Sequence, residues 1–209
     1  MYLFSRQRQI NPAHLRKAVP AALEIGGRVK QITGLDLSVW MSSMSAQVGV
    51  VSWSVLVDRL TDLETATDKL TAESSFGDLV EQNDGLFSGP LTDILAQIVP
   101  GAPEPAAETP TYTMVVTTTA ANGQFAAAMA AGVELANEVT RVGGLPTTFL
   151  VGVTGLYGRV AWVAGAPDLA ALEDFNSRID TNEELGRLID SHGTKFTPGG
   201  EVTFFHRIS

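Results

Sequence analysis

The sequence predicts an α+β fold made of two tandem copies of one β-α-β-β-α-β unit. Five residues recur as the same type 110 positions later: Tyr2, Glu24, Val29, Gly34 and Leu35. Five more recur 109 positions later, after a gap of one residue near the first predicted hairpin: Gly49, Val51, Trp53, Leu79 and Phe87. Such a repeat indicates duplicated architecture. Residues 100–110, rich in Pro, Gly and Ala, form a predicted stiff linker between repeats 1–99 and 111–209.

The first copy begins with a predicted strand and a long helix. Residues 2–10 alternate between two sets of side chains, which favours a strand. Asn11 and Pro12 are typical of a helix start, since Asn caps and Pro is tolerated in the first turn. Apolar residues then recur at spacings of three and four, so we expect a helix that ends at Gly34.

A hairpin, a second helix and a short strand complete this copy. Residues 35–44 and 47–57 are two β-rich runs joined by a short link. Residues 61–64 (Thr-Asp-Leu-Glu) have the capping-box pattern, which predicts the start of the second helix. The run 91–98 is the predicted last strand.

The second copy repeats these signals in the same order. Its predicted elements are a strand at 111–119, a helix at 121–142, hairpin strands at 145–152 and 157–163, a helix from 168 to about 191, and a strand at 201–208.

Composition narrows the class of protein. With 44% hydrophobic residues, the 209-residue chain can bury a sizeable core. A net charge of −9 argues against general affinity for nucleic acid or an anionic membrane, because phosphate binding needs a basic face. The absence of cysteine removes disulfides, thiolate metal sites and thiol nucleophiles. No segment has the pattern of a secretory signal or a membrane span, so we expect a soluble cytoplasmic protein.

The β-α-β-β-α-β order is the ferredoxin-like motif, whose two helices cover one face of the sheet. The other face, rich in Val, Trp and Leu, must also be buried, and packing the two sheets face to face would achieve this. This arrangement, with the paired Trp53 and Trp162 on the third strand of each copy, resembles the dimeric α/β barrel superfamily and its antibiotic-monooxygenase-like and NIPSNAP-like branches. The resemblance covers nearly the whole chain, in a tandem-fused form.

The resemblance implies a pocket between sheet and helices in each half. Known members include cofactor-independent monooxygenases, haem-degrading enzymes, chlorite-dismutase-like haem proteins, muconolactone isomerases and stress-response proteins. The haem-degrading branch combines an Asn, a Trp and a His, but residues 54–75 and 163–185 contain no His. His pairs with the spacing of zinc or di-iron ligands are also missing. The sequence therefore predicts no cofactor and no metal.

The candidate catalytic residues come from positions at which the copies differ. Arg6 and Arg8 share a predicted strand face, whereas copy two has Val116 and Thr118 there. Paired arginines could hold an anionic substrate by charge-assisted hydrogen bonds; a solvated or ion-paired strand is the structural alternative. The candidate catalytic residues are Arg6, Arg8 and His14, and the candidate substrate-binding residues are Tyr2, Phe4 and Trp53. For Trp53, a core position is the alternative.

Two functions remain open at this point. The first is a small-molecule-binding protein or a cofactor-independent, monooxygenase-like enzyme, with a pocket in the first lobe for a small anionic or aromatic ligand. The second is a non-catalytic structural or assembly protein that forms homo-oligomers. The weakly charged, Ala-rich stretch 125–142 motivates the second reading and predicts a homo-oligomer in either case. The sequence does not decide whether the chain is an enzyme.

Overall fold

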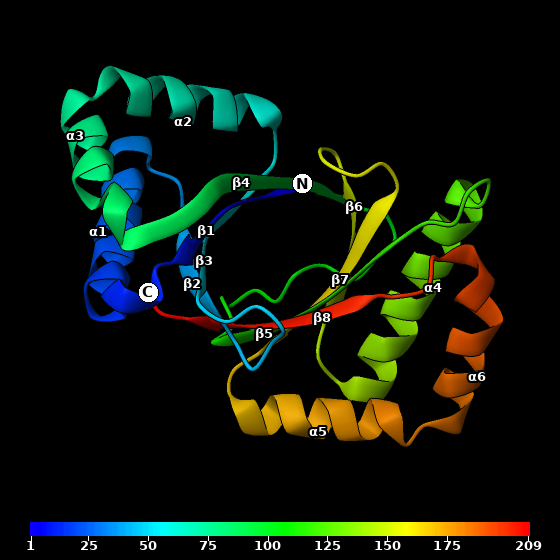
Figure 1. Ribbon diagram of the computed structural model, residues 1–209. Helices are drawn as coiled ribbons and strands as arrows, with labels where there is room; N and C mark the ends of the chain where they lie inside the picture. The colour runs from blue at the N-terminus through cyan, green and yellow to red at the C-terminus, as the bar shows by residue number, and fades with distance from the viewer. The chain divides into compact units, whose positions relative to one another are not determined.

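The computed structural model describes residues 1–209 and contains two units with the same order of elements (Figure 1). One unit comprises Met1–Leu95 with Arg207–Ser209, and the other comprises Ala96–His206. The strands β4 (Phe87–Ile98) and β8 (Glu201–Arg207) thus begin in one unit and end in the other. The hydrogen-bonded strand order, β1-β3-β2-β8-β5-β7-β6-β4, is that of a closed barrel. The predicted α+β class with two ferredoxin-like repeats is confirmed.

In the first unit, antiparallel strands carry three α-helices on one side (Figure 1). The strand β3 lies between β1 and β2. The elements up to β4 are β1 (Tyr2–Ile10), η1 (Pro12–His14), α1 (Leu15–Thr33), β2 (Ser38–Ser43), β3 (Val50–Val57), α2 (Leu60–Ala72), α3 (Ser74–Asn83) and η2 (Asp84–Leu86). The chain's last residues also belong here, because the Ile208 N–H donates to the Val39 carbonyl on β2.

The second unit repeats the arrangement, with β5 between β7 and β8, and β7 between β5 and β6. Its elements before β8 are β5 (Tyr112–Thr119), α4 (Phe125–Gly143), β6 (Thr147–Gly152), β7 (Arg159–Ala166), α5 (Leu169–Asp180), α6 (Glu183–His192) and η3 (Gly193–Lys195). Residues 99–111, between β4 and β5, contain no helix or strand. None of the helices has the length and apolar character that crossing a lipid bilayer requires.

Strand register locates the one-residue gap between the copies. Val39 on β2 pairs with Trp53 on β3, and Phe149 on β6 pairs with Trp162 on β7. The tryptophans are 109 positions apart, but their partners are 110 apart. The second copy is therefore one residue shorter in the hairpin loop itself.

The second predicted helix of each copy is wrong as a single element, because two helices are present. The backbone of Glu73 is extended and separates α2 from α3. In the other unit, Asn182 is extended and its side chain accepts the Leu185 N–H, which starts α6. An asparagine that caps a new helix satisfies a free N–H there, and this favours the break over a continuous helix.

Two predicted boundaries also need correction. The second helix begins at Leu60, because the Arg59 N–H bonds the Asp62 carboxylate and sets the first turn one residue earlier than Thr61. The last strand of the first copy begins at Phe87 rather than Leu91. Phe87 is 7% exposed, and this burial holds the strand's first residue against the core.

One tryptophan in each unit joins the sheet to the first helix. The Trp53 indole N–H donates to the Ala22 carbonyl on α1 at 2.9 Å, and the Trp162 indole N–H donates to the Gly132 carbonyl on α4 at 3.0 Å. These two carbonyls occupy equivalent positions in the repeat. A buried indole N–H needs an acceptor, so this bond fixes how each helix sits on its sheet.

The same tryptophans meet an equivalent phenylalanine, which directly follows the last short 3-10 helix of each unit. Trp53 and Phe87 pack edge to face with ring centroids 5.9 Å apart, and Trp162 and Phe196 do so at 5.3 Å. Edge-to-face geometry suits aromatic quadrupoles. Each tryptophan thereby connects a helix, the central strand and the last crossover of its unit.

Side-chain sizes have changed in pairs between the copies. The first unit has Ala22 and Val39 at the positions where the second has Gly132 and Phe149. A Cβ atom on Gly132 would lie 2.0 Å from the Phe149 ring, so the larger aromatic requires the glycine. Cores tolerate such exchanges when total volume is kept.

We expect Gly132→Ala to destabilise the protein by about 1–3 kcal/mol, because the new methyl group collides with the buried Phe149 ring. The matched control is Gly27→Ala on the exposed face of α1, where a Cβ meets nothing within 4 Å. This change should stabilise by about 0.5–1 kcal/mol through helix propensity. Urea unfolding curves measure both, and equal stability of the two variants would contradict the packing argument.

Candidate functional site

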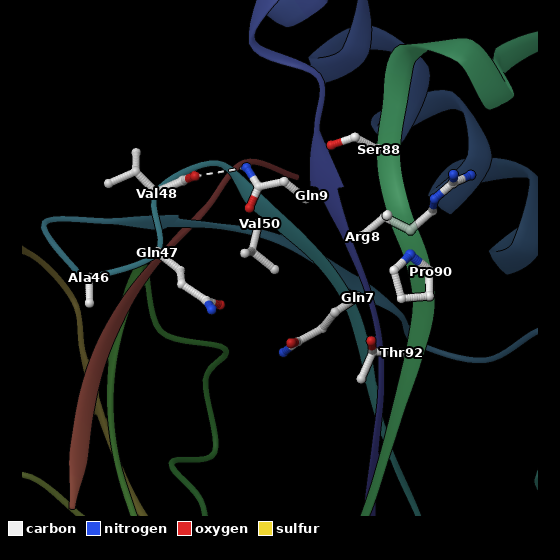
Figure 2. Close-up of a pocket in the computed structure, with 11 residues that line it drawn as sticks. Gln7, Arg8, Gln9, Ala46, Gln47, Val48, Val50, Ser88, Pro90 and Thr92 are labelled. Atoms are coloured by element: carbon white, nitrogen blue, oxygen red, sulfur yellow. Dashed lines mark hydrogen bonds between the residues drawn. The ribbon is translucent and has the colours of Figure 1, made fainter. Parts of the chain in front are cut away.

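The first unit has an open pocket of about 470 Å³ at one end of its sheet. It lies between β1, the β2–β3 hairpin and the start of β4 (Figure 2). The residues that line it are Gln7, Arg8, Gln9, Ala46, Gln47, Val48, Val50, Ser88, Gly89, Pro90 and Thr92. All of them belong to the first unit, so this unit alone forms the pocket.

Carboxamides and hydroxyls supply the polar chemistry of this pocket. Figure 2 shows the Gln7 and Gln47 side chains in the space between the hairpin and β4. The Gln9 amide instead donates to the Val48 carbonyl at 2.9 Å and holds the hairpin in place. No Asp, Glu, His, Lys or Tyr lines the pocket. It can therefore donate and accept hydrogen bonds but provides no general base from its lining.

The carboxamides are confined to the first copy. The residues equivalent to Gln7 and Gln9 are Thr117 and Thr119, and the residue equivalent to Gln47 is Leu156. Because the same backbone framework carries shorter or apolar groups in the second unit, the amide lining does not follow from the fold. It distinguishes the first unit chemically from the second.

Arg8 contributes to the pocket wall, but its guanidinium group is engaged elsewhere. Nη1 donates to the Asp84 carboxylate at 2.8 Å, and the guanidinium carbon lies 5.3 Å from the centre of the Phe87 ring. The side chain is 12% exposed, and its Nε has no hydrogen-bond partner. Cation–π contact and one ion pair thus replace most of the water around this group.

Arg6 forms a two-bond ion pair across neighbouring strands. Its Nε and Nη2 each lie 2.8 Å from one Asp93 carboxylate oxygen, and its guanidinium lies 5.7 Å from the Phe4 ring. The hydrogen bonds that Arg6 donates to Asp93 raise the pKa of Arg6, and burial opposes this shift. Arg6 thus stays charged at every pH at which the protein is handled.

The remaining predicted residues lie apart from the pocket. Trp53 is 6% exposed, and its only polar atom is bonded to α1. His14 is exposed at the end of η1. Tyr2 pairs with Val57 at the opposite end of β1. Of the six predicted residues, Arg8 alone lines the pocket, and a role in catalysis or substrate binding stays a prediction for all six.

Sequence reasoning missed a polar cluster in the second unit. His192 Nε2 lies 3.0 Å from a Glu134 carboxylate oxygen, and Lys195 Nζ lies 2.6 Å from His192 Nδ1. The spacing of His192 and Lys195 offers a weak signal in the sequence, but Glu134 is 58 positions away. Only the packing of α4 against α6 brings the third group in.

Solved structures match the chain over its whole length. A proposed monooxygenase from Fusobacterium nucleatum has a TM-score of 0.69 at 7% identity, covering 100% of this chain and 92% of its own. A proposed monooxygenase from Lactobacillus acidophilus scores 0.64 at 10% identity, covering 100% and 94%. An anthrone oxidase-like protein scores 0.63 at 11% identity, covering 100% and 91%.

The chain has the dimeric α/β barrel fold. At these identities the likeness shows the fold alone. The chain matches none of the protein-family models and none of the curated protein sequences with which it was compared. In this α/β barrel, no three His, Asp or Glu side chains are grouped so that they could hold a metal ion.

The second unit of the α/β barrel suggests a test of the Arg6–Asp93 pair, because Val116 faces Val202 at the equivalent positions. Arg6→Val or Asp93→Val alone should destabilise, since each leaves a half-exposed charge beside a valine. The double variant should recover about 0.5–1 kcal/mol as a cross-strand apolar pair. A double-mutant cycle by urea unfolding measures this coupling. Strict additivity would show that the ion pair is energetically neutral.

Proposed function

We propose that the chain is a small-molecule-binding protein with a monooxygenase-like fold, and that its ligand site is the amide-lined pocket of the first unit. The observation that carries this proposal is the set of glutamines, Gln7 and Gln47 above all, which line the pocket and have no counterpart in the second unit. Convergent polar groups in a concavity are the usual mark of a ligand site.

The lining favours a small ligand with an aromatic ring or an anionic oxygen. Amide N–H groups and the Thr92 hydroxyl can donate to a carboxylate, phenolate or carbonyl oxygen, and no carboxylate in the lining would repel it. Val50 and Pro90 offer apolar contact for a flat ring. A neutral amide can donate to a carbonyl oxygen or to a phenolate oxygen. The shape and acidity of a ligand would therefore decide which of these compounds binds.

The same lining bears on catalysis. Two neighbours are described as proposed monooxygenases and one as anthrone oxidase-like. If this chain oxygenates a substrate without a cofactor, the substrate must give up its own proton, because the pocket has no side chain to take it. Anthrone, which ionises readily to a stabilised carbanion, is a suitable probe: with O₂ it yields anthraquinone and water.

We expect native mass spectrometry and calorimetry with benzoate, phenol and anthrone to detect a ligand of the wild-type protein. Gln7→Thr with Gln47→Leu, which installs the residues of the second unit, should weaken binding at least about tenfold through the loss of two or more hydrogen bonds. The matched control is Leu156→Gln, the reverse change in the second unit, which should leave binding unchanged.

Equal affinity in the double variant and the wild type would contradict the proposed site. The absence of any bound mass and of any heat with all three probes would contradict the proposed function. Oxygen uptake with anthrone then separates an enzyme from a binding protein: uptake that disappears in the double variant supports catalysis in this pocket.

An assembly role is the second candidate, and a specific surface favours it. Each hairpin carries an exposed apolar side chain, Val48 in one unit and Tyr157 in the other. Tyr157 is 83% exposed and stacks on Phe125 with ring centroids 5.5 Å apart. Exposed aromatic residues are typical of protein interfaces.

If the chain self-associates through these hairpins, Tyr157→Ser with Val48→Ser should shift it toward the monomer. Sedimentation velocity at micromolar concentration measures the change. The control is Leu60→Ser, which removes a 42%-exposed apolar side chain at the start of α2. A wild-type monomer at this concentration would argue against the assembly role.

A further inference from the structure

Three side chains of the second unit form a linear chain of hydrogen bonds. Glu134 comes from the middle of α4, His192 from the last residue of α6, and Lys195 from the end of η3. The imidazole ring lies between the other two groups, with one ring nitrogen toward each. The His192 side chain is 12% exposed, whereas the Glu134 side chain is 58% exposed.

Glu134 and Lys195 determine which ring nitrogen of His192 carries the proton. A lysine ammonium can only donate, so at 2.6 Å the Nδ1 of His192 must accept. The ring proton is then on Nε2, which faces the Glu134 carboxylate at 3.0 Å. The neutral ring is therefore the tautomer with its proton on Nε2, and the lone pair of Nδ1 points at the Lys195 nitrogen.

This order of groups is that of an activated nucleophile: an attacking atom, an imidazole within hydrogen-bond reach that can take its proton, and a carboxylate that orients the imidazole. We propose that Lys195 is a nucleophilic amine that forms imines with small aldehydes or ketones, with His192 as the proton acceptor. Glu134 would stabilise the imidazolium that forms.

The step balances as follows. The Lys195 ammonium gives one proton to His192 Nδ1, and the neutral nitrogen attacks the carbonyl carbon while the C=O pair moves onto oxygen. The attacking nitrogen then loses one proton and the alkoxide gains one, which gives a neutral carbinolamine. The His192 imidazolium returns its proton to the hydroxyl, which leaves as water, and the product is the protonated imine. No oxidant, metal or cofactor enters the reaction.

The cluster does not follow from the fold, since the first unit lacks it. The residues equivalent to His192 and Lys195 are Asn83 and Leu86, while Glu24 is retained at the position of Glu134. The Asn83 amide bonds the Leu79 carbonyl of its own helix. The same crossover therefore packs without an ionic cluster, and packing alone does not require one. The proposal stands independently of the pocket in the first unit.

The chain has four lysines, Lys17, Lys30, Lys69 and Lys195, and this small number makes a direct test simple. The intact wild-type protein is treated near neutral pH with limiting propanal and cyanoborohydride, which reduces each imine in place. Peptide mass spectrometry then gives the labelling rate at each lysine. We expect Lys195 to be labelled at least about tenfold faster than the other three, a threshold set below the roughly 10²–10⁴-fold that general-base catalysis typically provides.

The informative variant is His192→Asn, because asparagine is what the first unit carries. It should reduce labelling at Lys195 to the rate of the other lysines and leave those rates unchanged. Glu134→Gln should give a partial loss. Urea unfolding of each variant checks that the fold is kept, and the unchanged rates at Lys30 and Lys69 serve as internal controls.

Two results would overturn the proposal. One is wild-type labelling at Lys195 no faster than at the other lysines. The other is fast labelling at Lys195 that persists in His192→Asn, which would show that simple exposure causes it. If His192→Asn fails to fold, Glu134→Gln decides: a partial loss of labelling at Lys195 supports the relay, and an unchanged rate there overturns it.

Discussion

The indole hydrogen bond between the third strand and the first helix is the constraint on which the rest of each unit depends. A helix that packs on a sheet can slide and rotate at low energetic cost when only apolar contacts hold it. The buried N–H of Trp53 or Trp162 removes that freedom, because leaving it unpaired would cost about 1–3 kcal/mol. The accepting carbonyls of Ala22 and Gly132 fix the helix position, and small residues at these points let the indole approach. The phenylalanine that meets each indole edge then holds the chain just after the last short 3-10 helix of the unit, and in the first unit β4 begins there.

Both units share this tryptophan-centred packing. They differ chemically at side chains that the packing does not need. The exchange of Ala22 and Val39 for Gly132 and Phe149 leaves room for the larger ring in the second unit. By contrast, the glutamines of the first unit are not repeated in the second, and the first unit keeps only the glutamate of the Glu134–His192–Lys195 chain. Burying a polar group costs free energy of desolvation. A polar group that packing does not require is therefore a good candidate for a functional role.

Much of the fold can be read from the sequence, because the repeat and the alternation of apolar residues are local signals. The paired tryptophans and the glycines that end each first helix indicated equivalent elements correctly.

The candidate site was harder to predict from the sequence than the fold. Strand alternation put Arg6 and Arg8 on one face, but nothing in the pattern shows that this face carries Trp53 and turns toward the helices. Arginine and histidine are common in catalytic sites and were therefore the candidates. The pocket is instead lined by glutamines, a residue type that does not by itself indicate a site. Glu134 and His192 meet only through tertiary packing.

The electrostatics of the first unit explain why the guanidinium groups of Arg6 and Arg8 are engaged outside the pocket. A guanidinium group in a partly enclosed site loses water, and it needs a counter-charge or an aromatic face to compensate. Arg8 finds both in Asp84 and Phe87, and Arg6 finds a two-bond partner in Asp93. Both positive charges are thereby neutralised within the unit, and the pocket is left with neutral dipoles. A ligand of the proposed site would then be selected by hydrogen-bond direction rather than by net charge. Such a site would change its affinity little with ionic strength, because screening acts on charges far more than on neutral hydrogen bonds.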